Sequence, residues 1–339
     1  MSRSLLPYRG IPNSTTSLIR RLHRLAHHIE KTALMKPSAL SVLIFMIGVL
    51  VPSVTHAWWA DGHQLIAAIA YQQLTATEQA RVDTILAQHP NIATWSSGGA
   101  SHLEIFMKAS TWADEIRNYN DPSTHADWHF IDYKLKPTTY PTLADLKPTD
   151  NVVVGITQLT GWLDDPHVTP PEQAKNLAFL IHFVGDIHQP LHCECLFNST
   201  FPATTYPDGD RGGNRFMVYT NATMTHKTKL HSLWDGLLGD GEALTDIEAR
   251  VGSLMTAHPR SDFSAQLAKT DPNDWSLESR ALAISTGYKP LPALNGTTSH
   301  PVTLPANYMS QAQSLSEKQA ALAGYRLADK IKAIIAANP

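Results

Sequence analysis

Cysteine is scarce in this chain: two occur among 339 residues, Cys193 and Cys195. Their C-x-C spacing is too short for an ordinary structural disulfide. The sequence therefore predicts no disulfide framework, and a strained local bridge, free thiols and an intermolecular bond all stay open for the pair. Stability must come from a packed core, and 43% apolar residues are enough for one large domain or two small ones.

Long apolar runs are lacking too. SALSVLIFMIGVLVPSVTHA, residues 38–57, contains a run of about 12 apolar residues, too short to span a membrane comfortably. A proline and a small-residue end at Ala57 follow, as is typical of an export signal. We predict that residues 1–57 are a signal peptide, with Met35 as a candidate for the true start. The protein would then be secreted or periplasmic, without stable membrane insertion after cleavage; the alternative is a single membrane anchor.

Positive charge is also limited. Residues 1–57 carry seven of the 27 Lys and Arg residues and one of the 30 Asp and Glu residues, which leaves 20 basic and 29 acidic groups and a net charge of −9. Such a protein lacks the broad basic face used to bind duplex nucleic acid non-specifically. An anionic substrate would need a local source of positive charge, and bound metal is the obvious one.

Helical periodicity dominates the rest of the chain. It predicts helices over residues 62–74, 101–119, 152–163, 171–188 and 314–337. YPDGDRGGNRFMVYT, residues 206–220, crowds Gly and Asp into a turn before a short alternating run, which predicts a loop and a small β-hairpin. No internal repeat and no domain linker is visible. We predict a mostly α, single-domain fold for residues 58–339.

Histidine is abundant, with 17 in the chain, and several lie near aspartates. Residues four apart share one face of a helix, so His182 and Asp186 in HFVGDIHQPLHC point the same way. His231 and Asp235 in LHSLWD repeat that spacing. A proline ends the first helix, and the turn brings His192 back toward the same site. Two such pairs predict a metal centre, because imidazole and carboxylate are common ligands.

Other polar residues strengthen this interpretation. Asp114 in WADEI, and His129 and Asp132 in DWHFID, stand in apolar surroundings, where unpaired charge is costly. Each alone is equally well explained as a satisfied polar residue of the core. His188 is six residues past His182, roughly 120° off its face, and we expect it to be structural rather than a ligand.

The predicted cleavage would leave a chain that begins WWADGHQ. The free α-amino group of Trp58 is a nitrogen ligand with its own carbonyl one chelate ring away, and His63 follows five residues later. The alternative is that the two tryptophans are only an aromatic plug. That alternative gives no reason for cleavage directly before Trp58.

Together these motifs resemble those of the zinc-dependent type I single-strand-specific nucleases. In chain order they are WWADGH, STWADEIR, WHFID, HFVGDIHQPLH, DRGGN, LHSLWD, WSLESR and AGYRLA. The resemblance covers nearly all of residues 58–335. It implies a single catalytic zinc nuclease domain over residues 58–339. The fold implied is the helical phospholipase C/nuclease type, with a trinuclear zinc site that the family shares with bacterial zinc phospholipase C.

Nine residues match the family's zinc ligands, in three sets. One zinc would be bound by Trp58, through its amine and carbonyl, and His63; a second by Asp114, His129 and His182, with Asp186 bridging these two; the third by His192, His231 and Asp235. Three protein groups per ion leave positions open for water and substrate. Three Zn²⁺ against three aspartates leave a formal +3, a cationic pocket in an acidic protein.

The resemblance also implies roles in catalysis. A zinc-bound hydroxide would attack phosphorus in line, with Asp114, Asp186 and Arg117 as the catalytic set. Arg117 would contact the phosphate, and Asp132 would orient that arginine or contact a base. Phe130 would stack on an unpaired base, which fits a preference for single strands. Asn214, in DRGGN, would orient a ligand.

We therefore expect an exported endonuclease and 3′-nucleotidase that hydrolyses single-stranded DNA and RNA to 5′-phosphate products. A monomer is favoured. The alternatives are a zinc phospholipase C acting on phospholipid head groups and a non-enzymatic zinc-binding protein. The close spacing of Trp58 and His63, with Asp235 as last ligand, looks like the nuclease branch. Zinc storage would not require Arg117 or Phe130 beside the metals.

Overall fold

The computed structural model describes residues 58–140, 149–221 and 223–337. The predicted signal peptide, residues 1–57, lies outside the described residues. The longer helices are α2 (Ala60–Gln72), α3 (Ala76–Leu86), α5 (His102–Ala109), α7 (Val152–Asp164), α8 (Pro170–Asp186), α10 (Leu244–Ala257), α12 (Pro272–Leu282) and α13 (Tyr308–Ala337). Short helical turns and five short strands connect them, so the predicted mostly α fold is confirmed.

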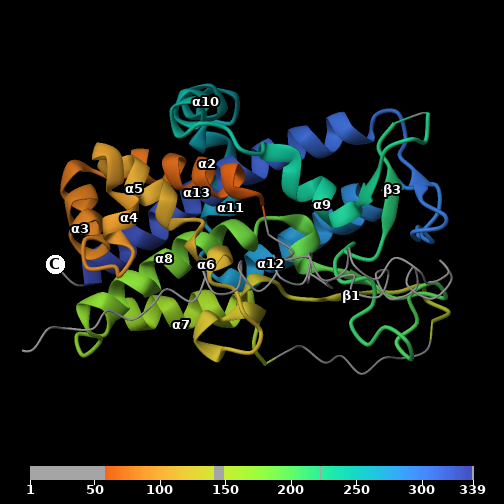
Figure 1. Cartoon of the computed structure of the whole chain (residues 1–339), viewed down its shortest axis with the longest axis horizontal. Coiled ribbons are helices and arrows are strands. Elements are labelled where there is room, and N and C mark those ends of the chain that lie inside the picture. The colour runs from red at the N-terminus through yellow and green to blue at the C-terminus, as the bar shows by residue number, and fades with distance from the viewer. Residues whose placement is uncertain (1–57, 141–148, 222, 338–339) are drawn as a thin grey trace, which may run out of the picture. The chain divides into compact units, whose positions relative to one another are not determined.

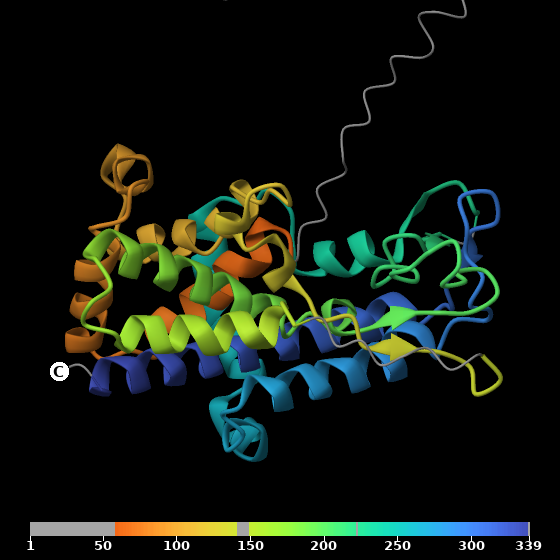
Figure 2. The same ribbon diagram turned by 90° about the horizontal axis from the view of Figure 1, so that it is seen from below.

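Helix α8 lies at the centre of the fold. It packs against α7, α3, α13, α6 (Trp112–Glu115) and α2, and every residue from 176 to 186 is buried. A helix that is apolar on all sides must be covered on all sides, which explains the ring of neighbours visible in Figures 1 and 2. Within this apolar segment His182 and Asp186 stand out, since both are fully buried and polar.

The chain breaks the predicted helix 101–119 into two. Helix α5 starts with a capping box, in which Ser101 and Glu104 each bond the other's backbone N–H. It ends at Ala109, where the Ser110 hydroxyl bonds the Met107 carbonyl (2.6 Å) and the Thr111 hydroxyl bonds the Lys108 carbonyl (3.0 Å). Such side-chain bonds compete with the helix ladder. The break turns the short α6, which carries Asp114, toward α8.

Helices α2 and α13 pack in close contact along much of their length. At Gly324 a Cβ atom would lie 2.5 Å from Ile69 Cγ2, so only glycine permits this approach. Neither α13 nor any other helix of the described residues is long and apolar enough to cross a bilayer.

The strands lie at the end of the helices opposite α3 and α4 (Ile92–Trp95) (Figure 1). β1 (Lys134–Leu135) pairs in parallel with β2 (Cys195–Leu196). β3 (Met217–Tyr219) pairs antiparallel with β4 (Lys227–Lys229) and parallel with β5 (Val302–Thr303). The predicted hairpin is therefore present, but its second strand begins beyond residue 220. β4 runs directly into α9 (Leu230–Asp235), so the hairpin positions the segment LHSLWD.

The remaining short elements connect these helices and strands. The 3₁₀ turns are η1 (Ser97–Gly99), η2 (Pro122–Thr124), η3 (Ala126–His129), η4 (Pro190–Cys193), η5 (Gly236–Leu238) and η6 (Arg260–Phe263), and α11 (Ser264–Leu267) is a single α turn. A π-helical turn, η7 (Ala283–Tyr288), extends α12.

Candidate metal centre and adjoining pocket

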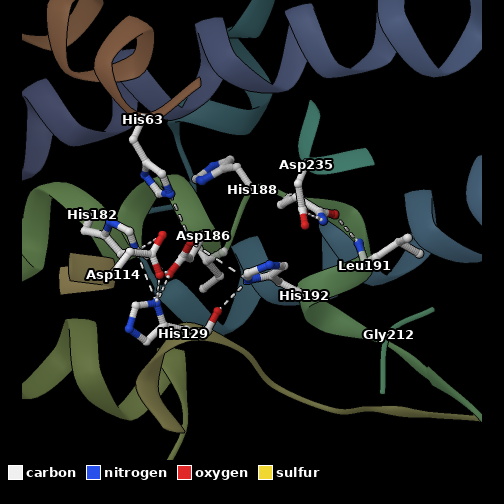
Figure 3. A network of polar contacts seen from close by, with 12 residues as sticks. His63, Asp114, His129, His182, Asp186, His188, Leu191, His192, Gly212 and Asp235 are labelled. Atoms are coloured by element: carbon white, nitrogen blue, oxygen red, sulfur yellow. Dashed lines mark hydrogen bonds and ion pairs between the residues drawn. The ribbon is translucent and has the colours of Figure 1, made fainter. Parts of the chain in front are cut away.

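Asp186 is the centre of the predicted ligand set (Figure 3). Its Oδ2 atom lies 3.0 Å from His129 Nδ1 and 3.2 Å from His182 Nε2, whereas Oδ1 lies 3.4 Å from His63 Nε2. The two oxygens of one carboxylate thus face different imidazoles. A carboxylate with its oxygens directed in this way could serve as a ligand to more than one ion.

Two adjoining groups of ligand atoms surround this carboxylate. One is formed by His63, Asp114 and His182 and the other by His129, His182 and Asp186, with the ligand atoms of each group within 4.8 Å of one another. Helix α2 supplies His63, α6 supplies Asp114 and η3 supplies His129. Asp114 faces both groups, since its oxygens lie 3.5 Å from His129 Nδ1 and 3.7 Å from His182 Nε2.

A third group consists of His192, His231 and Asp235. His192 comes from η4, directly after α8, and the other two come from successive turns of α9. The two imidazole rings stack at 5.0 Å with 20° between their planes, and His231 Nε2 lies 3.5 Å from Asp235 Oδ2. The spacing of four residues predicted this pairing, and the structure places it beside the first two groups (Figure 3).

Three of the imidazoles are fixed by backbone carbonyls. Each donates Nδ1–H at 2.6 to 2.7 Å: His182 to Ser110, His192 to His129 and His231 to Gly212. A carbonyl oxygen only accepts hydrogen bonds, so Nδ1 must carry the proton. When the ring is neutral, Nε2 keeps its lone pair for a metal, as the outer hydrogen bonds of metal-binding histidines usually ensure.

The electrostatics of the site favour a bound cation. Burial lowers the pKa of His63, His192 and His231, and lowers that of His129 to about 3, so these rings are neutral at pH 7. Burial alone would do the same to His182. Its pKa is nevertheless raised to about 9, because the Asp186 and Asp114 carboxylates outweigh the burial. The Asp186 and Asp114 carboxylates thus stabilise a positive charge at this position.

The donor atoms fit zinc. Within the described residues, His63 Nε2, His192 Nε2 and both oxygens of Asp186 make no hydrogen bond, although all are buried. Buried polar atoms of this kind are costly unless something else satisfies them. Imidazole nitrogen and carboxylate oxygen are ligands that zinc prefers. All three groups can therefore hold a metal ion of this type.

Trp58 is fully buried and lies two residues before the start of α2. A Cβ atom at Gly62 would lie 2.8 Å from Trp58 Cβ, so the first turn of α2 packs tightly on this residue. The N–H of Trp59 donates to the Asp235 carbonyl at 3.0 Å. The predicted mature terminus is thus tied to the elements that carry His63 and Asp235, while the metal-binding role of Trp58 stays a prediction.

Gln189 is a site residue that the sequence reasoning did not single out, although it lies inside HFVGDIHQPLHC. Its side chain is fully buried, Nε2 donates to Asp235 Oδ1 at 2.7 Å, and Oε1 accepts from the Leu191 N–H at 2.6 Å. Both ends of the amide are therefore satisfied, and the amide orients the carboxylate of the third group. His188, in contrast, faces Arg326 at 2.9 Å and not the ligands, as its place on the helix predicts.

A pocket opens beside the three groups. Its lining is Arg117, Phe130, Asp132, Leu191, His192, Arg211, Asn214 and His231. Arg117 is held in place beside the metal ligands, because Nη2 donates to the Tyr119 hydroxyl at 2.8 Å and Nη1 lies 3.8 Å from Asp114 Oδ1. Its guanidinium carbon lies 5.9 Å from the Phe130 ring centre. The pocket thus places a cation and an aromatic ring next to the ligand set.

Asp132 lines the same pocket and adds an acidic group to it. Burial and the neighbouring acids Asp210 and Asp208 raise its pKa to about 7, and Arg211 and Arg215 oppose that shift. Near neutrality this carboxyl can therefore donate or accept a hydrogen bond. The sequence pattern suggested Arg117 as the partner of Asp132. Arg211, in the motif DRGGN, was not predicted as a neighbour of this carboxyl group.

Asn214 lines the pocket as well. Its Nδ2 donates to the Arg211 carbonyl at 3.0 Å, and its Oδ1 is buried without a hydrogen bond among the described residues. Asp210 is placed behind the loop, where its oxygens accept from the Leu196 N–H and the Tyr288 hydroxyl, each at 2.8 Å. The first residue is available to a ligand, and the second anchors the loop.

Comparison with known proteins gives a consistent result. A family model described as S1/P1 Nuclease matches residues 58–336. Nuclease P1 of Penicillium citrinum is 27% identical over 298 residues, which cover 82% of this chain and 97% of that protein. Endonuclease 4 of Arabidopsis thaliana is 25% identical over 304 residues, covering 83% and 90%, and Nuclease S1 of Aspergillus oryzae is 25% identical over 313 residues, covering 84% and 94%. The family match begins at Trp58, the first residue after the predicted cleavage.

Proposed function

Since the chain belongs to the S1/P1 nuclease family, we propose that it is a zinc-dependent nuclease that hydrolyses single-stranded DNA and RNA to 5′-phosphate products. We include 3′-nucleotides among its substrates. The observation that carries the proposal is the pocket with Arg117 and Phe130 directly beside the His and Asp groups around Asp186. A metal-storage protein has no need of such a pocket.

The proposed zinc ligands are the nine residues named from the sequence: Trp58, His63, Asp114, His129, His182, Asp186, His192, His231 and Asp235. Three ions would be held, with Asp186 serving two of them; the two oxygens of Asp186, which face different imidazoles, support this. Zinc bound by these residues supplies Lewis-acid chemistry toward phosphate oxygens and water. Gln189 and the backbone carbonyls keep the ligand atoms oriented.

The chain's own pocket residues bind and orient the substrate. Arg117 presents a guanidinium, whose paired N–H groups match phosphate oxygens, and Tyr119 restrains it before the substrate arrives. Phe130 provides a face for a nucleobase. A base can stack there only when it is free of its own neighbours, so the pocket favours single strands. Asp132 and Asn214 provide hydrogen-bonding groups for the base edge.

We further propose export to the periplasm or the medium, with residues 1–57 removed, residues 58–339 as one catalytic domain, and a monomeric protein. Removal of the leader is required by the proposed role of Trp58, since only a free α-amino group can act as a ligand. The protein's net negative charge suits this arrangement, because the metal centre supplies the positive charge locally.

Product analysis tests the proposal. Processed protein supplied with zinc is offered a single-stranded oligonucleotide and phosphatidylcholine in parallel, with and without a chelator. We expect chelator-sensitive release of 5′-mononucleotides and no release from the lipid. Diacylglycerol production with intact oligonucleotide would transfer the protein to the phospholipase C reaction. If zinc is bound and neither substrate is cut, the proposed metal centre survives and the substrate assignment is wrong.

A further inference from the structure

We propose that Arg211 forms a second phosphate-binding position in the pocket, for the phosphate of a nucleotide adjacent to the cleaved bond. The inference rests on the proposed nuclease function. It assigns to Arg211 a part in substrate length recognition that Arg117, beside the metal ligands, does not fulfil.

The two arginines of the pocket have different partners. Arg117 lies beside the metal ligands, with Nη1 3.8 Å from Asp114 Oδ1. The Arg211 side chain pairs instead with Asp208, with Nε 3.3 Å from Oδ2. Both guanidinium groups line the same pocket, so Arg211 offers a second cation to a part of the substrate that Arg117 does not hold.

The backbone presents Arg211 on a rigid turn. Its φ is +55°, and Gly212 and Gly213 that follow have φ of +59° and +85°. A residue with a side chain is strained in this left-handed conformation. Anchors on both sides impose it: Asp210 bonds Leu196 and Tyr288 (both 2.8 Å), and a Cβ atom at Gly212 would overlap the Leu191 carbonyl oxygen. Glycine would be less strained at position 211, so the arginine is retained against a local conformational cost, which motivates a functional explanation.

The Arg211 side chain is available to a ligand. It is 42% exposed, and its ion pair among the described residues is formed by Nε, 3.3 Å from Asp208 Oδ2. Its Nη atoms make no hydrogen bond within the described structure, so the outer edge of the guanidinium can bind a phosphate oxygen pair.

The charges nearby show what this cation does. Asp132, Asp208 and Asp210 all lie near this part of the pocket, with Arg211 and Arg215 as the opposing charges. Arg215 is already bound to the loop, through the Gly209 carbonyl and Asp208. Without Arg211, the acids would repel a polyanion at this position. Arg211 is therefore the residue that makes the outer pocket acceptable to a second phosphate.

The test uses thymidine trinucleotides with two linkages. Hydrolysis to 5′-phosphate products gives different fragments for each linkage, so the bond that is cut can be identified. In two further substrates one linkage, on the 5′ or the 3′ side, is an uncharged methylphosphonate. The full chain is expressed, processed by its host, supplied with zinc, and compared with Arg211→Gly, Arg211→Lys and the control Met224→Gly.

Met224 is a matched control because it too is a non-glycine residue at positive φ, +53°, but lies in the β3–β4 loop and does not line the pocket. Both glycine variants should be at least as stable as the parent, since glycine relieves the backbone. Loss of activity in Arg211→Gly alone would then be due to the lost side chain and not to misfolding.

In the parent protein, neutralising one of the two flanking linkages should lower kcat/KM about five- to tenfold, as a half-exposed charge-assisted contact allows. In Arg211→Gly, kcat/KM for the fully charged trinucleotide should already be as low as that of the parent with the methylphosphonate. Replacing the linkage by methylphosphonate should then cause no further decrease. Arg211→Lys should be intermediate. The slope of log KM against log salt should also fall by about 0.7 in Arg211→Gly, the value for one contact to a single strand.

The inference would be overturned if, at both positions, the methylphosphonate lowered kcat/KM by the same factor in Arg211→Gly as in the parent. It would also be overturned if the methylphosphonate had no effect on the parent at either position. If the parent cuts neither the trinucleotides nor a longer single-stranded oligonucleotide, the proposed function itself is wrong and the inference falls with it; if it cuts only the longer one, the inference alone is wrong. Those results are distinguishable, because the first two require an active parent enzyme.

Discussion

Gly185 offers the sharpest test of how the metal ligands are packed. It lies in α8 directly before Asp186, and a Cβ atom there would lie 2.8 Å from His63 Nδ1 and 3.1 Å from His63 Cε1. Since unstrained carbon contacts begin near 3.4 Å, the His63 ring would have to retreat by about 0.6 Å in Gly185→Ala. The ring has little space to do so, because it is 1% exposed and stacks on His182 at 3.9 Å.

The variant should separate folding from function. Overpacking costs about 1–3 kcal/mol, while replacing a helical glycine by alanine returns about 1 kcal/mol, so the net loss in unfolding free energy is at most about 2 kcal/mol. Catalytic groups, however, tolerate displacements of only about 0.5 Å. We therefore expect a folded protein whose activity falls about 10- to 100-fold and whose zinc content falls with it.

The assay measures zinc per chain, the rate of single-strand hydrolysis and urea unfolding of chelator-treated protein. Gly252→Ala is the matched control, since Gly252 lies in α10 and a Cβ atom there would meet no atom within 4 Å. That change should leave activity intact and stabilise the protein by up to about 1 kcal/mol. If Gly185→Ala kept the full activity and zinc content of the parent, the packing argument for His63 would be refuted.

Three further predictions concern the ligands. A protein with one extra residue before Trp58 should bind one zinc fewer and lose activity, because the α-amino ligand becomes an amide. If that protein had the zinc content and the hydrolysis rate of the parent, Trp58 would be excluded as a ligand. Gln189→Leu should weaken zinc binding about 10- to 100-fold, since Asp235 loses its hydrogen-bond donor, and a zinc titration equal to that of the parent would contradict this. Zinc binding at pH 7 should release a proton, because the Asp186 carboxylate outweighs burial and raises the pKa of His182 to about 9. The affinity for zinc should therefore fall as pH decreases. Calorimetry in buffers of different ionisation enthalpy measures the released proton, and a zinc content that stayed unchanged down to about pH 3 would count against histidine ligands.

The helices could be predicted where the apolar spacing was regular, as for residues 152–163, 171–188 and 314–337. The continuous helix over 101–119 was wrong, because periodicity does not register the hydroxyls of Ser110 and Thr111 that bond the preceding turn. The hairpin was predicted from its turn, but the partner strand, Lys227–Lys229, has no alternation of its own and became a strand through pairing with β3.

The candidate site was predicted to a similar extent. The i, i+4 spacing placed His182 with Asp186 and His231 with Asp235, since helix geometry is a local property of the chain. Gln189 and Arg211 were not predicted, although both lie in motifs singled out from the sequence. Their significance depends on the hydrogen bond from Gln189 to Asp235 and on the charge of Arg211 near Asp132, 46 and 79 positions away in the chain.

The sequence by itself determined which side chains could bind zinc and which pairs share a helix face, and it predicts where the mature chain would start. These are consequences of residue type and short-range geometry. Only the tertiary structure decided that the two oxygens of Asp186 face different imidazoles, that backbone carbonyls fix the proton positions of three histidines, and that Arg211 and Arg117 line one pocket. Each of these depends on how segments far apart in the chain pack together, such as α2 and α6 against α8. No local pattern encodes that packing, because it is driven by burial of apolar surface, a force without direction.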